Sequence, residues 1–146
     1  MTWRIERHAV LNSTNTRALE MARAELAAGN SPAGIVVVAE RQTAGRGQHG
    51  RAWESPAGGL YFSAVVDSIP IGVRDRLALI AAAAALSALG SVGVASAGIW
   101  WPNDLMVGDR KLGGILCESI ALGQAWAAVV GIGINVQTPL EALSPS

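Results

Sequence analysis

The sequence predicts an α+β domain in which helices pack on a mixed, largely antiparallel sheet. Two observations predict this class. Short β-branched or alternating runs are interleaved with two segments of helix length, and the runs in the second half are separated by tight-turn residues. The 146 residues suit one domain, and a composition of 51% hydrophobic and 15% charged residues excludes a disordered chain.

The first half of the chain predicts one helix and three strands. We expect strands over residues 3–7, 35–39 and 60–66, and a helix over residues 16–28. The polar side chains of Ser13, Thr14 and Asn15 can cap this helix, and Gly29 with Asn30 ends it. The β-branched run of the second strand is typical of a strand that is covered on both faces.

The second half predicts one alanine-rich helix followed by antiparallel strands. We expect a helix over residues 74–89, a strand near Ile99, a hairpin with strands over residues 105–107 and 111–120, and a last strand over residues 125–136. Gly90 ends the helix in this prediction, and the two later turns lie at residues 108–109 and 122–124. The domain therefore covers residues 1–137. Residues 138–146, with two prolines and two serines, are expected to be a frayed tail or a cut point.

Charge and hydropathy exclude several partner classes. Eleven Lys and Arg residues balance eleven Asp and Glu residues, so no broad electrostatic field would hold nucleic acid or an anionic membrane. Residues 77–103 carry no charge and are long enough for a membrane span, but alanines, glycines and serines make a buried helix the better interpretation. We therefore expect no DNA partner and no membrane partner.

The cysteine and histidine content limits the chemistry. Cys117 is the single cysteine and lies in an apolar run, which predicts a buried, inert thiol. The first residues are charged where a secretory signal needs an apolar run, so we expect a cytoplasmic location. His8 and His49 lie far apart with no other ligand at metal-binding spacing, which predicts no metal site held by a dedicated protein cluster.

The glycine-rich loop over residues 43–51 is the most informative local feature. Closely spaced glycines let backbone N–H groups approach a ligand, while Arg46 and Arg51 supply fixed positive charge. The loop predicts a cradle for an anion or a phosphate, although it has neither the ending of a Walker loop nor the position of a dinucleotide fingerprint. A solvated mobile loop is the competing interpretation.

Two further segments carry candidate site residues. Residues 100–104 and 109–114 place a tryptophan pair and Asn103-Asp104 near Lys111; this is either a binding wall with one cation or, as residue types alone favour, two core tryptophans and a charged turn. In residues 131–136, glycines inside a strand indicate either a close approach to its backbone or a bulge. Asn135 there either binds a purine edge or ends the strand.

Together, the following motifs resemble the biotin protein ligases: Gly45-Arg46-Gly47-x-x-Gly50-Arg51-x-Trp53-x-Ser55-Pro56, Leu60-Tyr61-x-Ser63, Trp101-Pro102-Asn103-Asp104, Arg110-Lys111-Leu112-x-Gly114-Ile115-Leu116 and Gly131-Ile132-Gly133-Ile134-Asn135-Val136. Their order and spacing match throughout, and the resemblance also includes Ser13-Thr14-Asn15 and Gln42. It implies the catalytic-domain fold of the biotin and lipoate ligases, which is similar to that of class II aminoacyl-tRNA synthetases.

The resemblance implies a two-step ligase. Biotin and MgATP would form biotinyl-5′-AMP, which would then biotinylate a lysine of the biotin carboxyl carrier domain of a carboxylase. A carboxylate is already ionised at pH 7, so the first step needs charge neutralisation and alignment rather than a general base. Biotin and ATP are then substrates, and Mg²⁺ would be held largely by the ATP phosphates.

The resemblance also assigns roles to individual residues. Lys111 and Arg46 would be catalytic. Biotin would be bound by Ser13, Thr14, Asn15, Gln42, Gly45, Arg46, Lys111, Gly114 and Ile115. ATP and the adenylate would be bound by Arg46, Gly47, Gly50, Arg51, Trp53, Asn103, Asp104 and Asn135.

The chain departs from the family pattern in two residue types and in its extent. Trp100 stands where the family usually has lysine, which predicts that one phosphate-side cation is missing. Gln48 stands where the family commonly has arginine, which predicts looser retention of the adenylate. The chain also stops soon after Val136, whereas family catalytic domains continue, and it lacks the DNA-binding domain of the repressor-type ligases. Two alternatives stay open: a lipoate or octanoate ligase or transferase, which has the same fold, and a non-catalytic biotin-binding fragment, which the departures motivate. The oligomeric state is not predicted.

Overall fold

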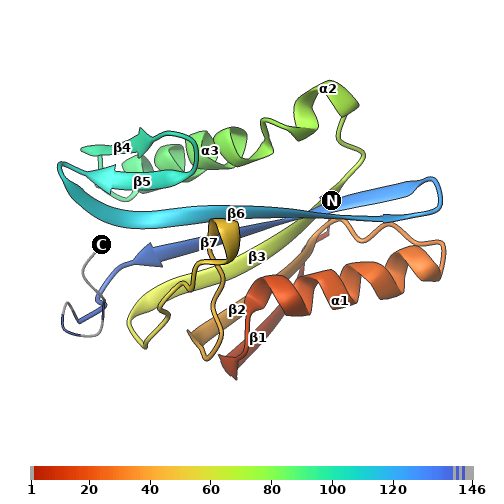
Figure 1. The fold of residues 1–146 in the computed structure, drawn as a ribbon, viewed down its shortest axis with the longest axis horizontal. Helices are drawn as coiled ribbons and strands as arrows, with labels where there is room; N and C mark the ends of the chain where they lie inside the picture. The colour runs from red at the N-terminus through yellow and green to blue at the C-terminus, as the bar shows by residue number, and fades with distance from the viewer. Residues whose placement is uncertain (1, 140, 142, 144–146) are drawn as a thin grey trace.

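A sheet of seven strands lies at the centre of the computed structural model, which describes residues 2–139, 141 and 143 (Figure 1). The strands are β1 (Arg4–Leu11), β2 (Ile35–Gln42), β3 (Gly59–Asp67), β4 (Ala97–Trp100), β5 (Asp104–Val107), β6 (Arg110–Leu122) and β7 (Ala125–Asn135). The helices are α1 (Thr14–Ala27), α2 (Ile71–Arg74) and α3 (Leu77–Ser91), with a short 3₁₀ turn, η1 (Gln48–Gly50). The strand order is β1-β2-β3-β7-β6-β5-β4, and only the β1–β2 pair is parallel among these neighbours. The predicted α+β class is confirmed.

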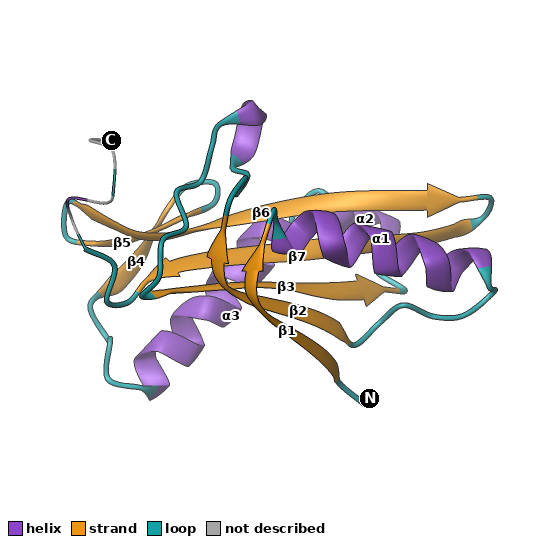
Figure 2. Ribbon diagram, turned by 90° about the horizontal axis from the view of Figure 1, so that it is seen from below, coloured by secondary structure: helices purple, strands orange, loops and turns teal. Residues whose placement is uncertain are grey.

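The central strand β7 is covered on both faces, because α1 and α3 lie on opposite sides of the sheet (Figures 1 and 2). Ala127 and Val129 belong to the core under α1, whereas Ala128 and Val130 belong to the core under α3. A strand in this position cannot alternate apolar and polar residues, which explains its continuous apolar run.

Alanines form much of the helix surface that contacts the sheet. Ala18 and Ala22 of α1 are fully buried, as is Ala82 of α3. Small side chains let the helices lie close to the larger residues of the sheet. Among the described residues, no helix is both long and apolar enough to cross a bilayer, and α3 has 15 residues.

Each of the two long helices is followed by a glycine with positive φ, and the same pattern of backbone hydrogen bonds closes both ends. The sequence predicts this glycine correctly for α1 but not for α3. In α1, Gly29 has φ 76° and Asn30 N–H donates to the Glu25 carbonyl at 2.9 Å, as the sequence predicts. The prediction that Gly90 ends α3 is wrong. Gly93, with φ 92°, supplies the left-handed residue, and Gly90 is the helical residue whose carbonyl accepts the Gly93 N–H.

Other boundaries differ by a few residues. α1 begins at Thr14 rather than at residue 16, because Ser13 is its N-cap. The predicted helix start at residue 74 is also wrong: Arg74 ends the short α2, its Nε donates to the Ile69 carbonyl at 3.2 Å, and its guanidinium lies 4.0 Å from the Trp126 ring centre. The β1 strand extends to Leu11 because it pairs with β2 over its full length. Of the predicted tail, residues 140, 142 and 144–146 lie outside the described residues, so the tail stays a prediction.

Candidate active site

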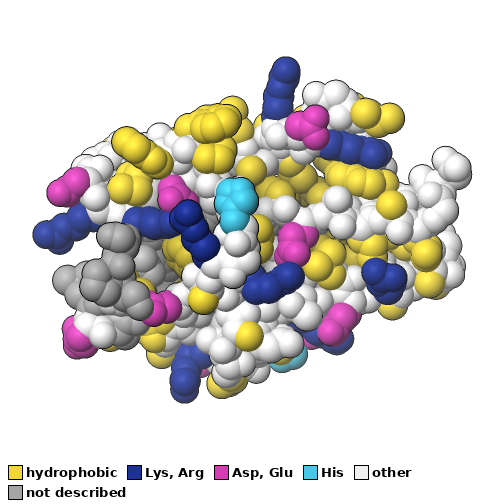
Figure 3. All heavy atoms as spheres, in the orientation of Figure 1, with side chains coloured by type: hydrophobic (Ala, Val, Ile, Leu, Met, Phe, Trp, Pro, Cys, Tyr) yellow, Lys and Arg dark blue, Asp and Glu magenta, His cyan; other side chains and the backbone are white. Residues whose placement is uncertain are grey.

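A pocket of about 320 Å³ opens on the α1 face of the sheet, at the start of α1 and beneath the glycine-rich loop. Its volume lies at the lower end of the range of small-molecule sites. Lys and Arg side chains gather on the face seen in Figure 3, near a histidine and with acidic side chains among them. The lining residues come from segments far apart in the sequence: Ser13, Thr14, Asn15, Gln42, Arg46, Gly47, Gln48, His49, Arg51, Ala52, Trp53, Trp100, Trp101, Pro102, Asn103, Asp104, Lys111, Gly114, Ile115, Leu116, Gly131, Ile132 and Gly133.

Glycines of β6 and β7 form part of the pocket floor. A side chain at Gly131 would collide with Asn15, and a β-carbon at Gly133 would lie 2.5 Å from Trp53 Nε1. The pairing of β6 with β7 continues without a break through both positions. The glycines therefore permit a close approach to the strand, and the bulge interpretation is wrong. The register irregularity of the sheet lies at residues 105–106 of β5 instead.

The start of α1 is tied to the end of β2 by hydrogen bonds. Gln42 Oε1 accepts the Thr14 N–H at 2.8 Å, and Gln42 Nε2 donates to Ser55 Oγ at 2.7 Å. Ser13 Oγ caps the helix by accepting the Thr16 N–H at 3.4 Å. The predicted biotin-binding side chains thus form an ordered polar wall, and the Gln42 amide is held at both its oxygen and its nitrogen.

Ser63 of β3 supports this wall from beneath. Its hydroxyl is fully buried and lies 2.8 Å from Thr14 Oγ1 and 2.5 Å from Asn15 Oδ1. Because a hydroxyl has one hydrogen and two lone pairs, it can serve both neighbours only in a defined orientation. Ser63 belongs to a family motif but not to the predicted site. Its hydroxyl contacts two residues of the polar wall, which explains why a serine suits this position.

Glu118 of β6 is a site residue that sequence reasoning missed. Its Oε2 accepts hydrogen bonds from Arg46 Nη2 at 2.6 Å and from Asn15 Nδ2 at 2.9 Å. Asn15 Nδ2 also contacts the Leu116 carbonyl at 3.3 Å. The available signal was a single carboxylate inside the apolar run of residues 112–122.

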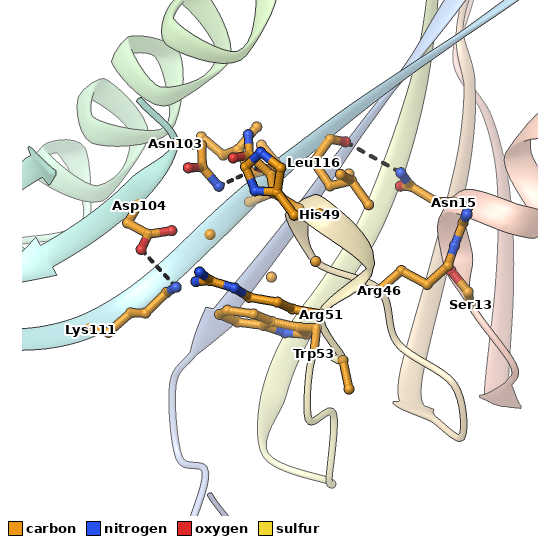
Figure 4. Close-up of a pocket in the computed structure, with 18 of the residues that line it drawn as sticks. Ser13, Asn15, Arg46, His49, Arg51, Trp53, Asn103, Asp104, Lys111 and Leu116 are labelled. Carbon is orange, nitrogen blue, oxygen red and sulfur yellow. Dashed lines mark hydrogen bonds and ion pairs between the residues drawn. The ribbon is translucent and has the colours of Figure 1, made fainter. Parts of the chain in front are cut away.

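Lys111 lies at the other end of the pocket, opposite the start of α1 (Figure 4). Its Nζ forms an ion pair with Asp104 Oδ2 at 2.7 Å and lies 5.4 Å from the Trp53 ring centre. Lys111 is also the only lysine of the 146 residues. Of the two interpretations of these segments, the binding wall with one cation is consistent with this placement of Asp104 and Lys111.

Asn103 uses its backbone and its side chain to hold β6. Its carbonyl accepts the Ile115 N–H at 2.9 Å, and its Nδ2 donates to the Ile115 carbonyl at 3.1 Å. The Ile115 side chain belongs to the core under α3. Both backbone polar groups of Ile115 are thus already bonded, so a ligand that used them would share them with Asn103.

The loop over the pocket is folded rather than extended. Gly47 N–H donates to the Arg51 carbonyl at 2.7 Å, and Trp53 N–H donates to the Gly45 carbonyl at 2.9 Å. His49 and Gly50 have φ of 56° and 75°, which turns the chain back at η1. The loop thereby places Arg46 and Arg51 on the rim of the pocket, as a cradle for an anion requires.

The tryptophan pair is not part of the core. Trp100 is 70% exposed and Trp101 is 76% exposed, and both line the pocket. The interpretation as two core tryptophans is wrong, because β4 is the edge strand and residue 101 lies in the turn that leads to β5. The binding-wall interpretation is the one consistent with this exposure.

Three predicted site residues lie outside the pocket lining. Gly45 packs against the Trp53 carbonyl and Ser55, and Gly50 supplies a left-handed turn. Asn135 Nδ2 contacts the Lys111 carbonyl at 3.5 Å. Among the described residues, Asn135 Oδ1 and Trp53 Nε1 are buried side-chain atoms without a hydrogen-bond partner.

Cys117 is not among the residues that line the pocket. Burial raises the pKa of the Cys117 thiol to about 11, so little thiolate exists at neutral pH, as expected for an inert thiol. Within residues 2–139, 141 and 143, no group of three or more His, Cys, Asp or Glu side chains is placed to hold a metal ion.

Comparisons with known proteins agree on one family. The Biotin/lipoate A/B protein ligase family matches residues 8–135. The bifunctional ligase/repressor BirA of Bacillus subtilis is 39% identical over 132 residues, which cover 88% of this chain and 39% of that protein. The biotin–[acetyl-CoA-carboxylase] ligase of Mycobacterium tuberculosis is 36% identical, with 98% of this chain and 53% of that protein covered.

A solved structure of biotin protein ligase from Leishmania major in complex with biotinyl-5-AMP has a TM-score of 0.77 and 30% identity. The match covers 97% of this chain and 59% of that one. The chain thus spans between about two fifths and three fifths of the length of these three proteins.

Proposed function

Because this chain belongs to the biotin/lipoate A/B protein ligase family, we propose that it is an ATP-dependent ligase that activates biotin as biotinyl-5′-AMP and transfers it to a lysine of a biotin carboxyl carrier domain. One observation carries the proposal. A single pocket joins a polar wall at the start of α1 to a cationic end at Arg51 and Lys111. The biotinyl-5-AMP in the Leishmania major structure and the biotin–[acetyl-CoA-carboxylase] ligase of Mycobacterium tuberculosis support it.

In the first step, a carboxylate oxygen of biotin attacks the α-phosphorus of ATP, and the bond to pyrophosphate breaks. The nucleophile is already an anion, so no residue has to remove a proton. The residues have to hold two anions together and stabilise the charge that develops on the phosphoryl oxygens. Lys111, Arg46 and Arg51 supply three positive charges around the pocket for this task.

In the second step, the amine of the carrier lysine attacks the acyl carbon of the mixed anhydride. The acyl–oxygen bond breaks, AMP leaves as an anion, and the amine loses one proton. Lys111 and the arginines then stabilise the departing phosphate. Positioning of the reactants therefore contributes to both steps, and neither step requires a catalytic triad.

Ion pairs order two cations of the pocket. Asp104 holds Lys111, and Glu118 holds Arg46. A phosphate that binds Lys111 has to share the ammonium group with Asp104. Because an ammonium group has three hydrogens, it can donate to both partners at once. Asp104 thus orients Lys111 without using all of its donors.

At the other end, Ser13, Thr14, Asn15 and Gln42 would bind the ureido ring of biotin. This ring has a carbonyl that accepts hydrogen bonds and two N–H groups that donate them, so it needs donors and acceptors on one wall. The hydroxyls and amides at the start of α1 offer both kinds of group. Gly45, Gly114 and Ile115 would contribute backbone groups.

The nucleotide would lie on the side of Trp53 and Asn135. The unpartnered Asn135 Oδ1 can accept a hydrogen bond from the amino group of adenine, and the Trp53 indole offers an aromatic surface. Gly47 and Gly50 would let the loop close over the phosphates, with Asn103 and Asp104 on the opposite wall.

Mg²⁺ is part of the proposal as a partner of ATP. Asp104 is the carboxylate among the lining residues, and its oxygens suit a hard cation that takes most of its ligands from phosphates and water. When bound, Mg²⁺ would neutralise phosphate charge.

A carboxylase carrier domain as the acceptor and a cytoplasmic location belong to the proposal as well.

Mass spectrometry of the products tests the proposal. The purified chain is mixed with biotin and MgATP, or with lipoate and MgATP, and biotinyl-5′-AMP or lipoyl-5′-AMP is quantified. We expect adenylate from biotin. Lys111→Ala should lower its formation on the order of 100-fold while leaving biotin affinity within about twofold, because the charge acts mainly on the phosphoryl group. Arg110→Ala, the neighbouring exposed cation of β6 outside the pocket, should leave the rate unchanged.

The remaining outcomes separate the alternatives. Adenylate from lipoate alone would indicate the lipoate-type ligase. Binding of biotin by the folded chain without adenylate would indicate a non-catalytic biotin-binding module. Equal adenylate formation by Lys111→Ala and the unaltered chain would remove Lys111 from the catalytic role.

A further inference from the structure

We propose that Glu118 is a positioning residue that fastens the glycine-rich loop to β6 through Arg46 and thereby presets the biotin end of the pocket. The identity of the ligand rests on the proposed function. The fastening itself does not, since it is a property of the ligand-free chain.

One carboxylate oxygen of Glu118 connects three segments. Its Oε2 accepts from Arg46 Nη2 of the loop at 2.6 Å and from Asn15 Nδ2 of α1 at 2.9 Å. Arg46 and Asn15 lie at the same end of the pocket (Figure 4). The two bonds bridge sequence separations of 72 and 103 residues, so they tie the site together across the fold.

The position of Glu118 favours such a role. Glu118 is two positions after Leu116, which lines the pocket and pairs with Gly131, so strand alternation places the Glu118 side chain on the pocket face of β6. The side chain is only 26% exposed. A half-buried carboxylate in a central strand is costly unless donors satisfy it, and Arg46 and Asn15 are such donors.

Holding Arg46 before a ligand arrives lowers the cost of binding. A free arginine loses much rotamer freedom when it is immobilised, whereas a paired arginine has already lost it. The guanidinium has five N–H donors, so one bond to Glu118 leaves others for a ligand. The pair also neutralises the carboxylate beside a site that is proposed to hold anions.

Hydrogen exchange of the ligand-free chain tests the fastening directly. In Glu118→Gln we expect the amides of residues 45–52 to exchange about fivefold faster, the factor that corresponds to loss of a partly exposed ion pair, while amides of β7 stay unchanged. The biotin dissociation constant should rise by a similar factor. Glu20→Gln is the matched control, because Glu20 pairs with an arginine at 3.5 Å on α1, outside the pocket lining.

Arg46→Gln provides the same test from the other partner. It should accelerate exchange of the same amides, and the double variant should show no further increase, because both substitutions remove one interaction. Unchanged loop exchange in Glu118→Gln, or additive effects in the double variant, would overturn the proposal. Failure of the unaltered chain to bind biotin would instead refute the proposed function, and the exchange rates would still decide whether Glu118 fastens the loop.

Discussion

Gly133→Ala should destabilise the chain and disturb the pocket, because the backbone of β7 touches the Trp53 indole at this position. The added β-carbon would lie 2.5 Å from Trp53 Nε1 and 2.8 Å from Cε2. To restore an ordinary separation of about 3.5 Å, the ring has to retreat by roughly 1 Å. A β-carbon built at Gly114, the partner of Gly133 on the neighbouring strand, would lie 3.2 Å from the same ring, so the indole covers the backbone of both strands.

The expected magnitude follows from two opposing effects. Overpacking of this kind costs about 1–3 kcal/mol. Replacing glycine by alanine inside a strand otherwise stabilises by about 0.5–1 kcal/mol. Gly98 of β4 isolates the second effect, because a β-carbon there would meet no heavy atom within 4 Å. Gly133→Ala should therefore be less stable than Gly98→Ala by about 1–3 kcal/mol.

Urea unfolding of the two variants measures this difference. Repeating the comparison in a Trp53→Leu background identifies its cause, since the smaller side chain should remove most of the penalty at position 133. Equal stability of Gly133→Ala and Gly98→Ala would refute the steric argument. A penalty that persists without the indole would show that the backbone of β7, rather than Trp53, requires the glycine.

Two further predictions concern the loop and the acid stability. Gln48→Arg should slow the release of bound adenylate severalfold, because an additional charged donor at the pocket rim can reach phosphate, and identical release rates measured by rapid dilution would contradict this. Hydrogen bonds from Arg17 and then His8 lower the pKa of Glu6 from 4.5 to about 2. This depressed value stabilises the fold above pH 4.5, and the contribution of about 1 kcal/mol after allowance for solvent screening is lost as the pH falls toward 2. Urea titrations of the unaltered chain and Glu6→Gln should converge over that range, and a constant difference would argue against the linkage.

Much of the fold could be predicted because its signals are local. Side-chain periodicity predicted each of the seven strands and both long helices, and glycine positions predicted the hairpin turns. Boundaries were less accurate where a distant contact decides them. The α2–α3 junction is an example, since the Arg74 guanidinium packs on the Trp126 ring of β7.

The candidate site was predictable in part. The motifs identified most lining residues, including Lys111, Arg46 and Asn15, but not which groups already bond to each other. Glu118 was overlooked because its partners are 72 and 103 residues away. The exposure of Trp100 and Trp101 was likewise misjudged, because burial depends on which strand lies at the sheet edge.

The sequence by itself determined the α+β class, the order of the elements and the family, because these follow from periodicity, turn residues and motif spacing along the chain. Only the tertiary structure decided that β7 lies between β3 and β6 and that Glu118 binds Arg46. It also decided that Asn15 packs against Gly131 and Trp53 against Gly133. The physical reason is that strand pairing and side-chain contact depend on packing between segments distant in sequence, which local preferences do not specify.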